Sequence, residues 1–245
     1  MALRKSNSPR LAFTASRPLI RSVSGPLRIT LLYERGNWVE HYARALANVL
    51  CDKCEVTFVA DKSALTSGDV LFYFNVQEIV AKEHRAKYKK NVVIHASDLP
   101  KDRGWSPYIH KILRGENSFP VTLCEAEDRV DSGAIYLQEP VTLEGHELLP
   151  EIRAEIGRAI VRACLWFIEM YPDIVGRPQA GEPTYCPKRG PADSRLDPAK
   201  PLIDQFDLLR CVDNDLFPAW FEARGRTYRL AITKDDRVYD GCCGD

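Results

Sequence analysis

One histidine closes an apolar run and precedes a loop that is rich in proline and glycine. Residues 91–95 read Asn-Val-Val-Ile-His, and residues 96–107 continue Ala-Ser-Asp-Leu-Pro-Lys-Asp-Arg-Gly-Trp-Ser-Pro. Histidine changes its charge near neutral pH, so His95 could move a proton or stabilise a developing negative charge. A histidine of this kind is, taken alone, more often a hydrogen-bonded structural residue than a catalytic one.

A carboxylate follows in a turn further along the chain. Residues 130–133 read Val-Asp-Ser-Gly. An aspartate beside a histidine orients the imidazole and stabilises its charged form. The alternative role for Asp131 is that of a turn former, because aspartate often bonds its own backbone in turns.

The elements that must position these residues alternate along the chain between strands and helices. Strand-like runs occupy residues 27–33, 54–60, 69–74, 91–95, 120–126 and 134–138. Helical spacing of apolar residues marks 38–50, 77–90, 105–113 and 148–170. This alternation predicts an α/β fold with a mostly parallel sheet, whose ligands bind at the carboxyl ends of the strands. His110 and Lys111, on the third helix, are expected to face solvent.

The amino-acid composition changes after the last of these helices. Residues 176–201 hold six prolines and three glycines, which is typical of a linker or of an extended wrapping segment. After it come a short helix over 202–211 and two strands near Phe221 and residues 228–232, with a hairpin turn at Arg224-Gly225. The predicted organisation is therefore a disordered basic leader (1–26), an α/β catalytic domain (27–175), a Pro-rich linker (176–200) and a small C-terminal α+β extension (201–245).

The composition excludes several classes of protein. Lys+Arg and Asp+Glu both number 34, so the chain lacks the basic surplus of a protein that lives on nucleic acid. No apolar run is long enough to cross a membrane. The 8 scattered cysteines indicate reduced thiols and a cytoplasmic protein, and the Cys51–Cys54 pair lacks the further ligands of a zinc site. An organellar presequence is the alternative for the Arg- and Ser-rich leader.

The loop after His95 and the turn at Asp131 together resemble the N10-formyltetrahydrofolate-dependent formyltransferases. The family pattern is Asn-x-His-x-Ser-x-Leu-Pro, an Arg/Lys-Gly segment and an Asp-x-Gly loop. The matching residues here are His95, Ser97, Leu99, Pro100, Arg103, Gly104, Pro107, Asp131 and Gly133. The resemblance implies a Rossmann-like formyltransferase domain, and residues 185–189 and 193–197 are similar to the C-terminal part of sugar N-formyltransferases. The family's asparagine is replaced by Val93, and Ser97 or Asn75 is a candidate to supply the missing hydrogen-bond donor.

The resemblance also implies roles for individual residues. Catalysis is expected from His95, Asp131 and Ser97, with His95 protonated and aimed at the oxyanion. The co-substrate N10-formyltetrahydrofolate is expected to contact the following residues: Phe74, Asn75, Val76, Gln77, Ala126, Asp128 and Val130. The amine substrate is expected to contact Arg103, Gly104, Trp105, Ser106, Pro107, Lys188 and Arg189. No metal is implied.

The acceptor is the open question at this stage. Residues 176–245 hold 11 Lys+Arg and 12 Asp+Glu, which does not favour binding of tRNA as in methionyl-tRNA formyltransferase. A primary amine on a nucleotide-linked amino sugar is the favoured acceptor, with no nucleic acid or membrane partner and with a homodimer left open. One alternative is a protein of the same fold that binds folate or a sugar nucleotide without turnover, because Val93 replaces the amide. The others are a methionyl-tRNA formyltransferase and a formyl-folate hydrolase.

Overall fold

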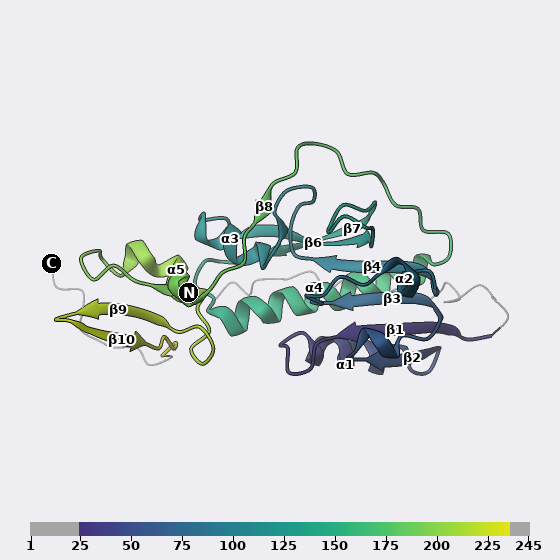
Figure 1. Ribbon diagram of the computed structural model, residues 1–245, viewed down its shortest axis with the longest axis horizontal. Coiled ribbons are helices and arrows are strands. Elements are labelled where there is room, and N and C mark those ends of the chain that lie inside the picture. The colour runs from purple at the N-terminus through teal and green to yellow at the C-terminus, as the bar shows by residue number, and fades with distance from the viewer. Residues whose placement is uncertain (1–24, 236–245) are drawn as a thin grey trace, which may run out of the picture.

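A six-stranded sheet forms the centre of the protein, whose structure is a computed structural model that describes residues 25–235 (Figure 1). The order β2-β1-β3-β4-β6-β7 brings together strands β1 Leu27–Tyr33, β2 Cys54–Val59, β3 Gly68–Phe74, β4 Tyr88–His95, β6 Ser118–Glu125 and β7 Ile135–Thr142. Strands β1 to β4 pair in parallel, and β6 runs antiparallel to both β4 and β7. The predicted α/β fold with a mostly parallel sheet is confirmed, whereas most of the predicted leader, residues 1–24, lies outside the described residues.

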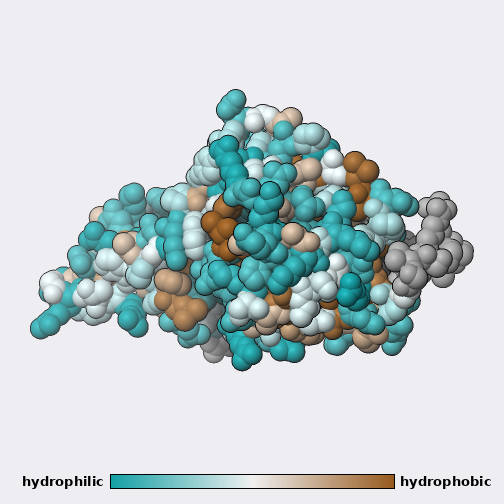
Figure 2. Space-filling model, turned by 45° about the vertical axis from the view of Figure 1, so that its right-hand side comes forward, coloured by the Kyte–Doolittle hydropathy of each residue, from teal (hydrophilic) through white to brown (hydrophobic). Residues whose placement is uncertain are grey.

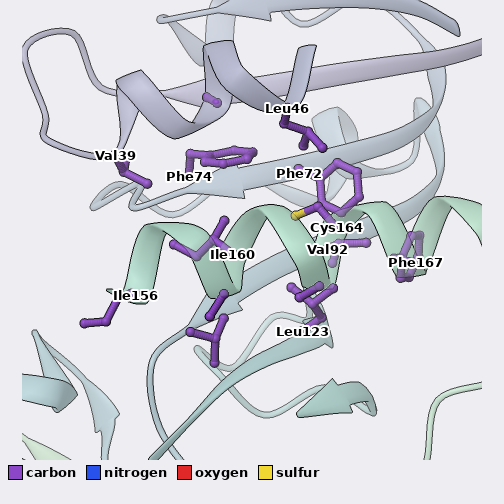
Figure 3. Close-up of a cluster of buried hydrophobic side chains, with 14 of the residues drawn as sticks. Val39, Leu46, Phe72, Phe74, Val92, Leu123, Ile156, Ile160, Cys164 and Phe167 are labelled. Atoms are coloured by element: carbon purple, nitrogen blue, oxygen red, sulfur yellow. The ribbon is translucent and has the colours of Figure 1, made fainter. Parts of the chain in front are cut away.

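Two helices cover one face of this sheet and close the main core. Helix α1 (Glu40–Leu50) and the long helix α4 (Leu149–Met170) pack together beside it. Figure 3 shows Phe72 of β3 against Phe167 of α4, and their ring centroids lie 5.5 Å apart at an interplanar angle of 76°. The apolar positions of α4 recur every three to four residues, so one side of the helix can stay buried along its whole length.

The segment after β3 differs from the sequence prediction. A helix over 77–90 is wrong: α2 spans only Lys82–Arg85, and β4 already begins at Tyr88. Tyr88 pairs with Gly68 across the sheet, and a Cβ on Gly68 would lie 2.9 Å from the Tyr88 ring. This pairing across 20 positions of sequence outweighs the local helical spacing, and it leaves residues 75–81 as a loop at the carboxyl end of β3.

The Pro-rich segment (residues 176–200) is an extended chain that packs along the domain. Figure 1 shows it passing over the top of the sheet, in green. Arg177 forms an isolated bridge with Ile135, and β8 (Tyr185–Cys186) pairs in parallel with β5 (Arg103–Gly104). Of the two structures predicted for this segment, the described residues adopt the wrapping one.

A small C-terminal unit follows and projects from one end of the molecule (Figure 1). It contains α5 (Phe206–Arg210) and the antiparallel hairpin of β9 (Ala219–Ala223) and β10 (Arg226–Leu230). The predicted hairpin turn at Arg224-Gly225 is confirmed, and both residues have positive φ angles, 50° and 72°. The remaining short elements are α3 Pro107–Leu113 and the 3-10 turns Lys62–Ala64, Pro191–Ser194 and Ile203–Gln205.

No helix within residues 25–235 has the length and apolar character needed to cross a bilayer. On the face shown in Figure 2, the apolar side chains form separate small patches among polar ones.

Candidate functional site

His95 lies at the carboxyl end of β4 and has acceptors on both sides of its ring. Its Nε2 lies 2.9 Å from the carbonyl oxygen of Asp102, and its Nδ1 lies 3.7 Å from Oδ2 of Asp131. A carbonyl can only accept, so this contact places a proton on Nε2 and leaves Nδ1 as the nitrogen that can gain or lose one. Both side chains are 8 % exposed, so the pair is largely shielded from water.

The loop that carries Asp131 is fixed by close backbone contacts. Asp131 itself has a φ of 53°, and its Oδ2 accepts a 2.9 Å hydrogen bond from the Gly104 amide. A Cβ on Gly133 would lie 1.9 Å from the carbonyl oxygen of Glu125, so only glycine lets the loop approach β6 this closely. The His95 loop and the Asp131 loop therefore hold each other through Gly104 as well as through the two side chains.

The Pro-rich segment supports both loops from outside the sheet. Nε2 of Gln179 donates to the carbonyl oxygens of Asp131 and Gly133 at 2.8 and 2.9 Å, and its Oε1 accepts from Arg103 at 2.6 Å. A Cβ on Gly104, whose φ is 98°, would lie 2.7 Å from the carbonyl oxygen of Cys186. The two glycines of the sequence pattern are thus the points where other backbone comes nearest.

Asp102, whose carbonyl contacts His95, belongs to a partly buried cluster of charged side chains. Oδ2 of Asp102 lies 3.2 Å from Lys111 Nζ and 2.9 Å from Arg114 Nη2, and its amide donates to Thr184 Oγ1 at 2.8 Å. Burial alone would raise the pKa of Asp102, but the hydrogen bonds from Arg114 and Lys111 outweigh it and lower that pKa. The prediction that Lys111 faces solvent is wrong, because its side chain is 7 % exposed and pairs with Asp102 and Glu116.

A cavity of about 390 Å³ opens beside this pair. It lies between the loop after β3 and the loop that precedes Asp131, and its walls mix apolar and polar groups as small-molecule sites do. The lining residues are Tyr73, Asn75, Val76, Gln77, Glu78, Ile79, Val80, Arg85, Val93, Ile94, His95, Gly104, Trp105, Ser106, Ala126, Glu127, Val130 and Asp131. A second cavity of about 70 Å³ shares His95, Asn75, Gly104 and Ser106 with it and is otherwise mostly apolar.

A wider groove of about 670 Å³ lies on the far side of the loop after His95. Asp102, Lys111, Arg114 and Glu116 line it, and these charges pair with one another. His95 does not line this groove, so the 390 Å³ cavity is the candidate site.

Five of the seven predicted folate contacts line that cavity: Asn75, Val76, Gln77, Ala126 and Val130. The two others lie elsewhere. Phe74 is fully buried in the main core, on the opposite sheet face from Tyr73, which does line the cavity (Figure 3). Asp128 is exposed and forms an ion pair with Arg85, a cavity residue.

Ser97, a candidate donor from the sequence, and Asn91, which lies on β4 with His95, both already have hydrogen-bond partners. Ser97 is fully buried, and its hydroxyl donates to the Lys101 carbonyl at 2.9 Å. Asn91 accepts from Tyr73 and donates to the Arg85 carbonyl, so its amide is occupied as well. Val93 lines the cavity and lies on the same face of β4 as His95, two positions before it.

The predicted substrate contacts divide between cavity residues and residues that hold the loops. Gly104, Trp105 and Ser106 line the 390 Å³ cavity, and Pro107 lines the 70 Å³ cavity. Arg103 is 6 % exposed and serves mainly to bind Gln179.

The two basic residues of the Pro-rich segment that were predicted to contact substrate have different partners. Lys188 Nζ lies 4.4 Å from the centroid of the Trp105 ring, at the edge of the cavity. Arg189 instead donates to the Asp193 carbonyl at 2.6 Å, and neither Lys188 nor Arg189 itself lines either cavity.

Several site residues escaped sequence reasoning because their partners are remote in the chain. Gln179 and Thr184 lie 48 and 82 positions from the residues that they bind. Arg129 hydrogen-bonds Tyr185, and this contact, followed by that of Arg103, lowers the pKa of the Tyr185 hydroxyl. The only local signal was the proline content of the segment. Within residues 25–235, no three His, Cys, Asp or Glu side chains form a group that could hold a metal ion.

Comparison with known sequences finds methionyl-tRNA formyltransferases among the relatives of this chain. A methionyl-tRNA formyltransferase of Coprothermobacter proteolyticus is 34% identical over 126 residues, which cover 49% of this chain and 40% of that protein. One from Dinoroseobacter shibae is 31% identical over 141 residues, covering 56% of this chain and 46% of the relative. The chain thus spans less than half the length of these curated relatives. No family model matches the sequence.

Solved structures share the fold at lower identity. A methionyl-tRNA formyltransferase from Clostridium thermocellum superposes with a TM-score of 0.73 at 20% identity, covering 87% of this chain and 96% of that one. A sugar N-formyltransferase from Shewanella sp. gives 0.65 at 15% identity, covering 86% and 99%. HypX from Aquifex aeolicus, in complex with tetrahydrofolic acid, gives 0.69 at 20% identity, covering 85% of this chain and 38% of HypX.

Proposed function

This chain belongs to the formyltransferase family, and from that premise we propose that it transfers a formyl group from N10-formyltetrahydrofolate to a primary amine. The observation that carries the proposal is the His95–Asp131 pair in the wall of the 390 Å³ cavity. The pterin ring of the folate would enter between the loops 75–80 and 126–131, whose apolar side chains suit a flat ring. The formyl carbon would then lie close to His95.

The chemistry needs a proton to leave the attacking amine. As the amine nitrogen bonds to the formyl carbon, the carbonyl electrons move to oxygen and the nitrogen becomes positively charged. The resemblance implied a protonated His95 aimed at the oxyanion, but its Nε2–H is already hydrogen-bonded to the Asp102 carbonyl. In this proposal Nδ1 of His95 instead accepts the proton of the amine. Asp131, 3.7 Å away, stabilises the imidazolium that results. The carbonyl then re-forms, the bond to N10 breaks, and N10 takes up the proton to give tetrahydrofolate.

The acceptor amine is proposed to sit on a nucleotide-linked sugar. The described part of the Pro-rich segment brings Lys188 over the Trp105 ring at the mouth of the cavity, which suits a flat base or a phosphate. Residues 176–245 carry 11 basic and 12 acidic side chains, so this part of the sequence lacks the basic surplus that favours binding of tRNA. The contrary observation is that the curated relatives cited above are methionyl-tRNA formyltransferases. Methionyl-tRNA is therefore the second candidate acceptor.

The test follows tetrahydrofolate release from N10-formyltetrahydrofolate with three additions: buffer, a nucleotide-linked 4-amino sugar, and methionyl-tRNA. Release only with the amino sugar supports the proposal. Release only with methionyl-tRNA contradicts the acceptor but keeps formyl transfer. Release without any amine supports a hydrolase, and folate binding without release in any arm supports a binding protein; both results contradict formyl transfer.

A further inference from the structure

Asn75 stands where the two cavities beside His95 meet. It lines both the 390 Å³ cavity and the 70 Å³ cavity. Its backbone has a φ of 50°, a left-handed conformation that few residues other than glycine adopt, although asparagine tolerates it best. An exposed residue held in this conformation at the end of a core strand is a feature that clusters at functional sites.

The sheet register brings this side chain level with His95. Tyr73 of β3 pairs with Val93 of β4; β4 continues to His95, and β3 ends at Phe74, so Asn75 is the first residue after it. Asn75 and His95 therefore lie at the carboxyl ends of neighbouring strands, and both residues line the two cavities. Among residues 25–235 the Asn75 amide has no hydrogen-bond partner, which leaves both of its N–H groups free for a ligand.

The other donors near the reacting position are already engaged. Nε2 of His95 donates to the Asp102 carbonyl, and the Ser97 hydroxyl donates to the Lys101 carbonyl. The Gly104 amide is bound by Asp131 Oδ2. If Nδ1 of His95 accepts a proton from the amine, the histidine offers no N–H at the moment when negative charge develops on the formyl oxygen.

We propose that the side-chain amide of Asn75 donates the hydrogen bond that stabilises this oxygen. The assignment rests on the proposed function and adds a residue to it. When the amine–carbon bond forms, the negatively charged formyl oxygen accepts a hydrogen bond from the Asn75 N–H. The negative charge disappears when the carbonyl re-forms and the carbon–N10 bond breaks. Donation to an oxyanion in a shielded site contributes to the rate far more than the same bond in water. Ser106 is the rival, because it also lines both cavities and has a φ of 42°.

The test is Asn75→Gly, which removes the amide and relaxes the left-handed backbone at the same time. We expect kcat for tetrahydrofolate release to fall by about 10²–10³-fold, as for loss of one oxyanion donor. The dissociation constant of 5-formyltetrahydrofolate, which cannot donate its formyl group here, should change by less than about threefold, since the bond is made only in the transition state. Arg224→Gly is the matched control, because Arg224 is exposed, has the same φ of 50° and lies in the remote β9–β10 hairpin.

Three results would overturn the assignment. The first is an Asn75→Gly variant with unchanged kcat. The second is a loss of affinity for 5-formyltetrahydrofolate that accounts for the whole loss of kcat/KM, because Asn75 would then be a folate-binding residue. The third is a larger loss of kcat in Ser106→Gly than in Asn75→Gly. A wild-type protein that transfers no formyl group contradicts the proposed function itself, and the assignment with it.

Discussion

The strand ends of the main sheet and the Pro-rich segment (residues 176–200) contribute to one site in different ways. The strand ends provide the side chains that face the cavity, His95 after β4 and Asn75 after β3. The Pro-rich segment provides hydrogen bonds to the loops behind them, through Gln179 to the Asp131 loop and through Thr184 to Asp102.

The two regions also differ in how they are stabilised. The strand ends inherit their positions from the packed sheet, where Phe72 and Val92 are fully buried. The Pro-rich segment has little core of its own, but its five prolines restrict its unfolded states and so reduce the entropy that ordering it would cost. The comparison teaches that changes at the strand ends should affect the chemistry, whereas changes in the segment should affect the alignment.

The largest effect is expected from the catalytic pair. His95→Asn removes the group that takes the proton, and Asp131→Asn removes the charge that stabilises it. Either variant should lower kcat by about 10²–10⁴-fold, the range for a positioned general base. Thermal unfolding measured alongside should show a folded protein, and near-full turnover in one variant would remove that residue from the mechanism.

Asp102→Asn tests the residue on which both regions converge. Asparagine keeps the left-handed backbone, φ 58°, but leaves the buried Lys111 with only Glu116 as a charged partner. We expect the free energy of unfolding at pH 7 to fall by about 3 kcal/mol, as when a buried pair loses one member. Urea unfolding of both proteins measures this difference.

The difference should depend on pH in one direction. The pKa of Asp102 is lowered in the folded protein, so its carboxylate stabilises the fold above the unfolded pKa of about 3.9. Wild type and Asp102→Asn should therefore differ constantly above about pH 5 and converge as the pH falls below about 4. A difference that persists undiminished under acid conditions would show that the charge of Asp102 is not its cause.

Gln179→Glu separates alignment from chemistry. The new carboxylate can still accept from Arg103, but it cannot donate to the carbonyls of Asp131 and Gly133. A shift of the Asp131 loop should lower kcat by about tenfold, less than the loss of a catalytic group, because small misplacements cost rate steeply. The pH–rate profile should keep its shape; a changed profile would place Gln179 among the groups that act on the proton directly.

The smallest effect is expected at Val93. With Asn75 supplying the donor, Val93→Asn in the wild-type background should change kcat by less than about twofold, because the oxyanion already has its hydrogen bond. In the Asn75→Gly background the same substitution should restore at least about tenfold of the lost rate, since it returns an amide to the same wall of the cavity. A large gain in the wild-type background would mean that the oxyanion lacks a donor there.

Sequence reasoning reached the parts of the molecule that local patterns control. The apolar run that ends at His95 and the spacing in residues 149–170 each predict an element that the structure contains. Glycine at 104 and 133 carried information because a Cβ at either position would lie less than 3 Å from a backbone carbonyl oxygen. The catalytic roles of His95, Asp131 and Ser97 remain predictions, although the hydroxyl of Ser97 is engaged with the Lys101 carbonyl.

The rest depends on partners that are far apart in the chain. The local spacing of apolar residues around Tyr88 predicts a helix. Tyr88 is instead a strand residue, because it pairs with β3. The local sequence predicts that Lys111 faces solvent, but its side chain is buried, where it forms ion pairs with Asp102 and Glu116. Gln179 has no local signal at all, since its function is to join two loops that the sheet brings together.

The most direct test of the account follows the formyl carbon itself. N10-formyltetrahydrofolate labelled with ¹³C in the formyl group is incubated with the protein and a nucleotide-linked 4-amino sugar, and ¹³C NMR follows the label. The account predicts that the label moves into an N-formyl amide on the sugar, in equal amount to the tetrahydrofolate formed, and that His95→Asn nearly abolishes this. Label that appears as formate, or label that stays on the folate, would contradict it.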